Sequence, residues 1–435
     1  MATSSDYSIR RNDMMKYRTH GIGWTVQYVL IGVLCLVFSQ ALWAQENQAT
    51  VEFGRKLRRA FNQIFTGQDD NVGAFPFIEP GMEYINHRIG DKPWSIHVLK
   101  IERSGKYHFI STLANEVIPG LVTVRGQIES LSDESGRPIA AVNGDFFHIR
   151  PGLYQGDPLG LHIAKGELTS APTGTSFWID TEGKPRIGEV MSKFRATCEN
   201  GMNIPFGLNE ARSDNAAVLY TPIIGESTRT SSGIELTLKS EANSEWLPLR
   251  AGLRYQAKVA AINNNGNTTL APDVMVLSIG PALAERLPVF EVGTTISLSL
   301  ATSPDLKGAR IAIGGGPVLV KDGKPIKWRS KPIRHPRTAV GFNSECMFLI
   351  VVDGRQEKLS AGMNYPELAD MMIRLGCREG MNLDGGGSST FWLGGQVLNS
   401  PSDGAERKVA NSLIVVAREQ QTDEDKSGAE NVTSK

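Results

Sequence analysis

Residues 381–390 read Met381-Asn382-Leu383-Asp384-Gly385-Gly386-Gly387-Ser388-Ser389-Thr390, and the predicted arrangement of the surrounding chain follows from this stretch. Just upstream, residues 365–375 place apolar side chains at helical spacing and are followed by Gly376, a residue type that commonly ends helices. We therefore predict a helix over 365–375 and then a buried strand that ends at Asp384. Three glycines without Cβ atoms let backbone N–H groups approach an anion, and the hydroxyls of Ser388 and Ser389 add neutral donors. This loop is predicted to form the floor of a site for a sugar or a phosphate ester, with an ordinary tight turn as the alternative.

Length and composition limit the classes of protein that need to be considered. The chain has 435 residues, of which 40% are hydrophobic, enough for a sizeable core in two or three domain-sized units. Basic and acidic residues balance to a formal net charge of zero, so nothing in the overall charge calls for a nucleic-acid partner. Cys198, Cys346 and Cys377 allow at most one disulfide and match no zinc-binding spacing. We expect neither a metal nor a cofactor.

The N-terminal region has the pattern of an export signal. Four basic residues precede an apolar run over residues 28–38, which leads to Ala41-Leu42-Trp43-Ala44. We predict that residues 1–44 are a signal peptide or an N-terminal membrane anchor, since a stretch from Ile22 to Trp43 would be long enough for a membrane span. The protein is therefore expected to be exported, in the periplasm or outside the cell, with attachment to the inner membrane as the alternative.

Two further segments are predicted to lie outside the folded body. Residues 45–80 contain a basic amphipathic piece at 53–65 and are expected to be a linker. Residues 419–435 are charged and lack apolar periodicity, so we predict a disordered tail.

A second candidate site follows another buried strand. Residues 139–142 are small and apolar, and they run directly into Asn143-Gly144-Asp145-Phe146-Phe147. Polar groups at strand ends often hold ligands in folds of mixed helix and sheet. Asn-Gly is also a strong hairpin signal, so a simple turn is an equally good interpretation of the pattern.

Arginines at strand ends form the third pattern. The basic run over residues 324–337 ends where Arg337 and Thr338 enter a buried strand. Arginine keeps its charge, so an inward-facing guanidinium calls for a substrate phosphate or a buried carboxylate. The apolar strand over 346–352 ends at Asp353-Gly354-Arg355. Between these motifs, short strands recur over about residues 209–300 and predict a β-rich insertion or subdomain.

These motifs together resemble the phosphodiester glycosidase family. The segments that match are Asn143 to Phe147, Ile313-Gly314-Gly315-Gly316-Pro317, Arg337 to Gly341, Asp353 to Arg355, and Asn382 to Thr390. They occur in the family's order over roughly residues 90–417. The resemblance implies an α+β fold over residues 81–418, with a mixed β-sheet catalytic domain flanked by helices. It also implies hydrolysis of the glycosidic bond of a sugar-1-phosphodiester, such as an N-acetylglucosamine 1-phosphodiester, to free sugar and phosphate monoester.

The resemblance also indicates which residues form the site. Asp384, Asp145 and Arg337 are expected to be catalytic. The residues expected to bind substrate are Asn143, Gly144, Phe147, Thr338, Asp353, Arg355, Asn382, Gly385, Gly386, Gly387, Ser388 and Ser389.

A mechanism can be outlined from these assignments. We expect Arg337 and the amides of residues 385–387 to hold the phosphate, with Arg355 as a second candidate, and Asp384 or Asp145 to act as nucleophile or base. One alternative is a non-catalytic protein that binds an anionic envelope polysaccharide. Another is a phosphodiesterase in which Asp145, Asp353 and Asp384 hold a metal.

Overall fold

The computed structural model describes residues 79–417, apart from residues 90–92, 104, 241–245 and 329–332. The predicted signal peptide or anchor, the tail at 419–435 and all but the last two residues of the predicted linker lie outside the described residues. Within the described part of the chain, no helix is both long enough and apolar enough to cross a membrane. The predicted division of the chain into domains stays a prediction.

The predicted α+β class is wrong, because the described residues fold mainly as β-structure. They form four sheets, and among them only α4 (Tyr365–Arg374) is a helix of seven residues or more. The other α-helices of the described residues are short, namely α2 (Val124–Glu129) and α3 (Pro281–Ala284). The physical reason is that the apolar faces of the sheets are covered by other sheets, so a layer of flanking helices is not needed.

A seven-stranded sheet carries several of the predicted motifs. Its order is β1 (Met82–Ile89), β2 (Trp94–Glu102), β22 (Cys346–Val352), β21 (Arg337–Phe342), β23 (Glu379–Asn382), β19 (Val318–Lys321) and β20 (Lys324–Pro325). Neighbouring strands are antiparallel throughout. The predicted strand over residues 346–352 is confirmed as β22, which is buried along its whole length.

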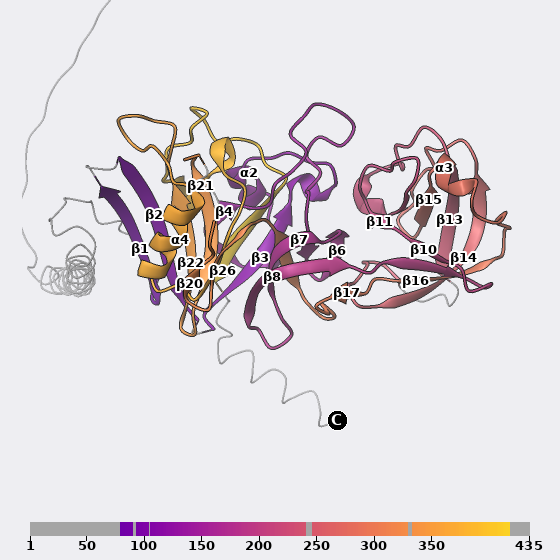
Figure 1. Ribbon diagram of the computed structural model, residues 1–435, viewed down its shortest axis with the longest axis horizontal. Coiled ribbons are helices and arrows are strands. Elements are labelled where there is room, and N and C mark those ends of the chain that lie inside the picture. The colour runs from indigo at the N-terminus through magenta and orange to yellow at the C-terminus, as the bar shows by residue number, and fades with distance from the viewer. Residues whose placement is uncertain (1–78, 90–92, 104, 241–245, 329–332, 418–435) are drawn as a thin grey trace, which may run out of the picture. The chain divides into compact units, whose positions relative to one another are not determined.

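A five-stranded sheet packs against it. Its order is β25 (Gln396–Val397), β24 (Phe391–Leu393), β4 (Arg137–Asn143), β26 (Asn411–Ala417) and β3 (Tyr107–Leu113). Leu99, Val340 and Leu349 of the larger sheet share one buried cluster with Val142 and Leu413 of the smaller. Figure 1 shows β21 and β22 close to β4 and β26, so the strand ends that carry Asn143 and Arg337 come together.

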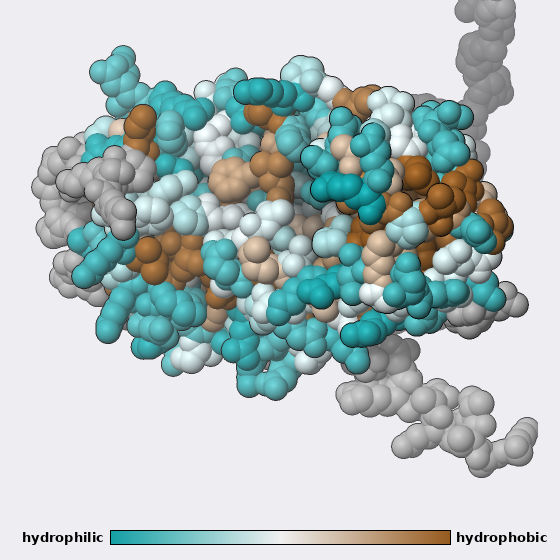
Figure 2. Space-filling model, turned by 45° about the vertical axis from the view of Figure 1, so that its right-hand side comes forward, coloured by the Kyte–Doolittle hydropathy of each residue, from teal (hydrophilic) through white to brown (hydrophobic). Residues whose placement is uncertain are grey.

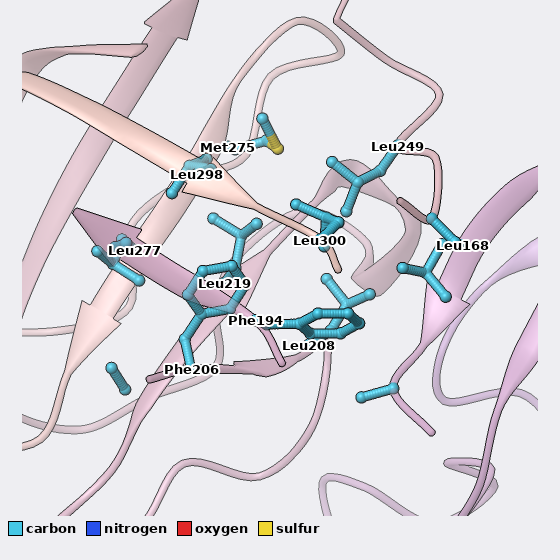
Figure 3. Close-up of a cluster of buried hydrophobic side chains, with 14 of the residues drawn as sticks. Leu168, Phe194, Phe206, Leu208, Leu219, Leu249, Met275, Leu277, Leu298 and Leu300 are labelled. Atoms are coloured by element: carbon cyan, nitrogen blue, oxygen red, sulfur yellow. The ribbon is translucent and has the colours of Figure 1, made fainter. Parts of the chain in front are cut away.

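The other two sheets are built from strands between residues 162 and 314. The six-stranded sheet has the order β17 (Thr302–Ser303), β8 (Pro185–Ser192), β7 (Thr173–Ile179), β18 (Ile311–Gly314), β5 (His162–Ala164) and β6 (Glu167–Ser170). The eight-stranded sheet has the order β10 (Asn203–Pro205), β9 (Arg195–Cys198), β16 (Thr295–Ser299), β14 (Arg254–Asn263), β13 (Ile234–Ser240), β15 (Met275–Ile279), β12 (Ala217–Tyr220) and β11 (Gly207–Leu208). Figure 3 shows its core, in which Phe194, Phe206, Leu219, Leu277 and Leu298 pack together.

Helix α4 fixes the strand that leads to Asp384. The side chain of Asn364 accepts a hydrogen bond from the Glu367 amide, and the side chain of Glu367 accepts one from the Asn364 amide, which closes a capping box. The predicted apolar face is confirmed, since Leu368, Met371 and Met372 are buried. A Cβ atom on Gly380 of β23 would overlap the end of the Met372 side chain, so glycine at this position leaves room for the buried Met372.

Candidate active site

Asn143, at the end of β4, joins the two sheets at the predicted site. Its Nδ2 donates to the Asp384 carbonyl at 2.8 Å, and its Oδ1 accepts from Thr338 Oγ1 at 2.7 Å. Oδ1 also accepts from the Thr390 amide at 3.1 Å. Asn143 is fully buried, so this amide acts as a bridge between β4, β21 and the loop after β23. Three of the sequence motifs are thereby in direct contact.

Asp384, whose carbonyl accepts the hydrogen bond from Asn143, is the first carboxyl group of the site. Its amide donates to the Gly144 carbonyl at 2.9 Å, and its Oδ1 accepts from the Gly385 amide at 2.8 Å. Burial raises the pKa of Asp384, whereas hydrogen bonds from Ser388 and Gly385 and the charge of Arg407 act in the opposite direction. The side chain keeps some exposure to solvent, as a reacting carboxylate requires.

Asp145 is the second carboxyl group of the site and is more deeply buried. Its Oδ1 accepts from the Phe146 amide and its Oδ2 from the Gly160 amide, both at 2.7 Å. The pKa of Asp145 is raised to about 7, chiefly by burial and also by the nearby charge of Asp384. The hydrogen bonds from the Phe146 and Gly160 amides act in the opposite direction. A Cβ atom on Gly314 would overlap Oδ2, which gives the second glycine triplet a packing role beside this carboxyl.

The glycine triplet at 385–387 is explained by three different neighbours. A Cβ atom on Gly385 would lie 2.7 Å from the Pro336 carbonyl oxygen, and one on Gly386 would lie 2.9 Å from Arg355 Nη2. Gly386 also has a positive φ of 63°. A Cβ atom on Gly387 would overlap the paired side chains of Asp403 and Arg407. Each glycine therefore lets a different group approach the loop.

The amides of this triplet differ in how free they are to meet a ligand. The Gly385 amide is bonded to Asp384 Oδ1, and the Gly386 amide donates to the Pro336 carbonyl at 2.9 Å. The Gly387 amide has no hydrogen-bond partner within the described part of the chain. A phosphate held here would meet one free amide rather than the three that the sequence suggested.

Arg337 is buried, and its guanidinium lies among backbone carbonyls and an aromatic ring. Its Nε donates to the Met363 carbonyl at 3.0 Å, and its Nη2 donates to the Ile333 carbonyl at 3.2 Å. The guanidinium carbon lies 4.2 Å from the centre of the Tyr365 ring. Burial lowers the pKa of Arg337. No carboxylate among the described residues forms an ion pair with it.

Arg355 is exposed and has an unusual backbone conformation. Its φ is +59°, in the left-handed region that non-glycine residues seldom adopt. Nη2 lies 3.4 Å from His335 Nδ1 and packs over Gly386. Burial lowers the pKa of His335, as do the charges of Arg337 and Arg355. Arg355 has no carboxylate partner in the described residues, so its charge is available to a ligand.

Arg407 is a third arginine at the same loop, and the sequence did not single it out. Its Nε and Nη2 donate to Asp403 Oδ2 at 2.8 and 2.6 Å, and its Nη1 donates to Ser388 Oγ at 3.3 Å. Asn411 was missed as well, although its Oδ1 accepts from the Asp145 amide at 2.8 Å. Arg407 lies in an irregular polar loop without periodicity and offers no local signal. Asn411 does offer one, because it is an amide residue at the start of an apolar strand, as Asn143 is at the end of one.

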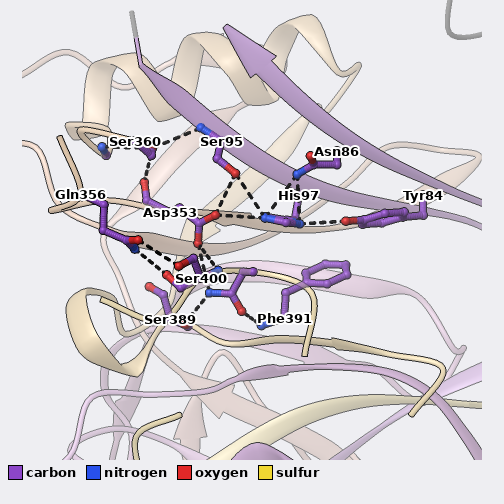
Figure 4. Close-up of polar contacts among 12 residues, drawn as sticks. Tyr84, Asn86, Ser95, His97, Asp353, Gln356, Ser360, Ser389, Phe391 and Ser400 are labelled. Carbon is purple, nitrogen blue, oxygen red and sulfur yellow. Dashed lines mark hydrogen bonds and ion pairs between the residues drawn. The ribbon is translucent and has the colours of Figure 1, made fainter. Parts of the chain in front are cut away.

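Asp353 proves to be a support for the site (Figure 4). Its Oδ2 accepts from Ser95 Oγ at 2.8 Å and from His97 Nε2 at 3.1 Å, and its Oδ1 accepts from the Ser400 amide at 2.8 Å. Asn399 also donates to Oδ1, at 3.3 Å, and to the Ser389 carbonyl, at 2.9 Å. This buried carboxylate therefore helps to hold the chain around Ser389, and both of its oxygens accept hydrogen bonds from protein donors.

The remaining predicted residues make contacts within the fold. Phe147 packs with Val124, Ile128 and Trp392 in a hydrophobic cluster. The Nδ2 of Asn382 donates to the Gly316 carbonyl at 2.9 Å. In the described part of the chain, buried polar atoms without a hydrogen-bond partner include three at this site, namely Asn382 Oδ1, Ser389 Oγ and Asn411 Nδ2. These atoms can pair with water or with a polar ligand.

The described part of the chain also contains a cavity away from this site. A cavity of about 1130 Å³ is lined by Phe109, Ser111 and Gln127, among others, and none of the predicted site residues lines it. Within the described residues, no group of three or more His, Cys, Asp or Glu side chains is placed to hold a metal ion. The convergence of Asp145, Asp384 and the three arginines is the arrangement best suited to chemistry.

Comparison with known proteins agrees with the motifs. Residues 257–416 match the model of the family described as phosphodiester glycosidase. An uncharacterized SPbeta prophage-derived protein of Bacillus subtilis, YomE, is 37% identical over 123 residues, which are 27% of this chain and 19% of that protein. The N-acetylglucosamine-1-phosphodiester alpha-N-acetylglucosaminidase of Bos taurus is 40% identical over 68 residues, which are 15% of this chain and 12% of that protein. The matches thus span less than a fifth of either relative's length.

Solved structures show the same fold. A hypothetical protein from Synechocystis has a TM-score of 0.62 at 21% identity, over 78% of this chain and 62% of that one. A putative exported protein from Burkholderia pseudomallei has a TM-score of 0.56 at 21% identity, over 74% of both chains. At this level of identity the likeness concerns the fold alone.

Proposed function

The chain carries a domain of the phosphodiester glycosidase family, and from this premise we propose that the protein hydrolyses the glycosidic bond of a sugar-1-phosphodiester. The products are a free sugar and a phosphate monoester, and an N-acetylglucosamine 1-phosphodiester is a representative substrate. The observation that supports this most directly is that the carboxyl groups of Asp384 and Asp145 lie near each other, next to the loop at 385–387. Arg355 and Arg407 pack against the same loop.

The chemistry of such a substrate suits this arrangement. A phosphate monoester is a better leaving group than an alkoxide, so the reaction needs less help from an acid than ordinary glycoside hydrolysis does. It needs a carboxylate near the anomeric carbon and positive charge near the phosphate. In this proposal the site provides both.

Asp384 is proposed as the nucleophile or base. It is the more accessible of the two carboxyl groups, and Arg407, Ser388 and the Gly385 amide all favour its ionised form. Asp145, with a pKa near 7, is proposed as the second acid–base group. A partly protonated Asp145 also avoids placing two full negative charges side by side.

Arg355 is proposed as the main phosphate-binding residue. It has no carboxylate partner among the described residues, and its left-handed backbone represents strain of about 1 kcal/mol or more, of the kind that often marks functional positions. The Gly387 amide and Arg407 complete the phosphate site in this proposal. Arg337 contributes positive charge from its buried position, and its Nε and Nη2 donate hydrogen bonds to the carbonyls of Met363 and Ile333.

The N-terminal sequence pattern suggests that the protein acts outside the cytoplasm. We propose an exported protein, periplasmic or extracellular, that acts on a sugar phosphodiester or glycan. The putative exported protein from Burkholderia pseudomallei has a similar fold, which is compatible with this location.

The experiment that tests this proposal determines which product receives the oxygen atom of water. The full chain is incubated with a panel of sugar-1-phosphodiesters in oxygen-18 water, and the products are analysed by mass spectrometry. Label on the anomeric oxygen of the released sugar is the expected result. Label on the phosphate would establish P–O cleavage and refute the glycosidase proposal. Saturable binding without any product would identify a binding protein instead.

A further inference from the structure

A buried polar network, with His97 at its centre, lies next to the turn that carries Arg355. Figure 2 shows hydrophilic side chains across much of one face of the molecule, where water can satisfy their hydrogen bonds. His97 and Asp353 are buried instead, with only 4% and 2% of their side chains exposed. Buried polar groups need partners within the protein, so their pairing constrains the chain around them.

The partners of His97 determine which ring nitrogen carries the hydrogen. Nε2 lies 3.1 Å from Asp353 Oδ2, and a carboxylate oxygen only accepts, so Nε2 is the donor. Nδ1 lies 2.8 Å from the hydroxyl of Tyr84, which donates to it in the neutral ring. Burial raises the pKa of Tyr84, and the charge of Asp353 raises it further, so this phenol keeps its proton. Figure 4 shows Tyr84, His97 and Asp353 in one row.

The carboxylate of Asp353 depends on this histidine for one of its donors. Oδ2 accepts from Ser95 Oγ at 2.8 Å and from His97 Nε2. Oδ1 accepts from Asn399 Nδ2 and from the Ser400 amide. No lysine or arginine of the described residues forms an ion pair with this carboxylate, so neutral hydrogen bonds alone fix its orientation. Loss of the His97 N–H would therefore let the carboxylate turn.

The turn that carries Arg355 is held at both of its ends. At the first end, the Asp353 amide donates to the Ser95 carbonyl at 2.9 Å, and Asp353 Oδ1 accepts from the Ser400 amide at 2.8 Å. At the other end, Gln356 Nε2 donates to the Ser400 carbonyl at 2.8 Å, and its Oε1 accepts from Ser400 Oγ at 2.9 Å. Arg355 lies between these ends with its φ of +59°. The orientation of the Asp353 carboxylate thus helps to decide where the guanidinium lies.

The same network reaches the glycine loop at 385–387. Asn399 Nδ2 donates to Asp353 Oδ1 at 3.3 Å and to the Ser389 carbonyl at 2.9 Å. Arg355 packs over Gly386, where an added Cβ atom would lie 2.9 Å from Nη2. The carboxylate therefore fixes both the loop and the arginine that faces it, and the histidine orients the carboxylate.

We propose that His97 is a positioning residue of the active site, which acts through Asp353 to hold Arg355 against the glycine loop. The guanidinium is then in place before the phosphate arrives, so little order has to be created when the phosphate binds. This role rests on the proposed function, in which Arg355 binds the phosphate of a sugar-1-phosphodiester.

The test is a double-mutant cycle between His97→Leu and Arg355→Gln, measured as kcat/KM on a sugar-1-phosphodiester. His97→Leu removes the N–H donor, and we expect kcat/KM to fall by about 10-fold to 10²-fold. In Arg355→Gln protein the same change should have little further effect, because the residue on which it acts is already absent. His97→Gln keeps an N–H donor and should restore most of the activity. Tyr84→Phe removes only the donor to Nδ1 and is the second variant for the cycle if His97→Leu does not fold.

Thr228→Val is the matched control. Thr228 Oγ1 donates at 3.0 Å to the buried carboxylate of Glu235 in the eight-stranded sheet, so this variant also takes one donor from a buried carboxylate. Its kcat/KM should be unchanged. An equal loss in Thr228→Val would overturn the proposal, and so would a loss in His97→Leu that is undiminished in Arg355→Gln protein and is not restored by His97→Gln.

Hydrogen exchange gives a second readout that needs no turnover. The Ser400 amide donates to Asp353 Oδ1, and the Phe391 amide donates to Asn399 Oδ1 at 2.7 Å. Exchange at both amides should be about 10-fold faster in His97→Leu and near normal in His97→Gln. Unchanged exchange in His97→Leu would overturn the inference even in an active glycosidase. Faster exchange in a chain that hydrolyses no sugar-1-phosphodiester would support the link from His97 to the turn while refuting the proposed function.

Discussion

The substitution Gly387→Ala separates the chemistry of the site from the stability of the fold. The added methyl group would overlap the far ends of two flexible side chains, Arg407 and Asp403, and the backbone of Gly387 is not in the left-handed region. The methyl can therefore be accommodated if these side chains rotate away. The fold then loses the Arg407–Ser388 hydrogen bond and a partly exposed ion pair, together worth about 1–2 kcal/mol.

The effect on catalysis should be much larger. Rotation of Arg407 removes a cation from beside Asp384 and from the proposed phosphate site, and loss of one preorganised charge-stabilising group commonly lowers kcat by on the order of 10²-fold. We expect kcat/KM on a sugar-1-phosphodiester to fall by about that factor, while the urea midpoint changes little.

The control for this experiment is Gly188→Ala in β8. A Cβ atom there would meet its nearest neighbour, the Trp178 ring, at an ordinary contact distance of 3.8 Å, so both activity and stability should stay near those of the unsubstituted protein. Full activity in Gly387→Ala would refute the role given to Arg407. A loss of activity that merely follows global unfolding would show that the glycine serves the fold instead.

Three further predictions follow from the same geometry. Asp384→Asn should lower turnover by on the order of 10³-fold or more with an unchanged circular dichroism spectrum and melting curve, and retained activity would remove Asp384 from its proposed role. Arg407→Gln removes a charge that opposes the raised pKa of Asp384, so the acid limb of the kcat/KM profile should move to higher pH, and Arg407→Lys should reverse much of that movement; an unmoved limb would contradict the assignment. Asp145 has a folded-state pKa of about 7 against 3.8 when unperturbed, so its contribution to stability is complete below about pH 4 and is lost as pH rises to about 7, on the order of 4 kcal/mol. Urea denaturation across this range should show a smaller loss of stability in Asp145→Asn than in the unsubstituted protein, and equal slopes would show that another group titrates.

Local elements were predictable because their signals depend on neighbours in the sequence. Helix α4 shows the apolar spacing of Leu368, Met371 and Met372, and Gly376 follows it with a positive φ of 95°. Strand β22 is a continuous apolar run, as predicted for residues 346–352. Helical period and apolar runs are set by the backbone geometry of a few residues, so they remain visible without any tertiary contact.

The fold class was not predictable in the same way. A buried apolar strand has the same sequence whether a helix or a second sheet covers it, and here the seven-stranded and five-stranded sheets cover one another. Helix α2 has the N-terminal cap Thr123, yet it ends after six residues at Ser130. Contacts between segments that are distant in the sequence decide whether a helix or a second sheet covers each apolar face.

By itself, the sequence determined the family motifs, the strand ends that bear Asn143 and Asp384, and the export pattern at the N-terminus, because each is written in consecutive residues. Only the tertiary structure decided how these motifs work together. Asn143 and the carbonyl that it binds are 241 positions apart in the sequence. The glycine triplet is needed because Pro336, Arg355 and Arg407 pack against it from three other segments. Such contacts depend on how sheets pack, and no local pattern of residues specifies that.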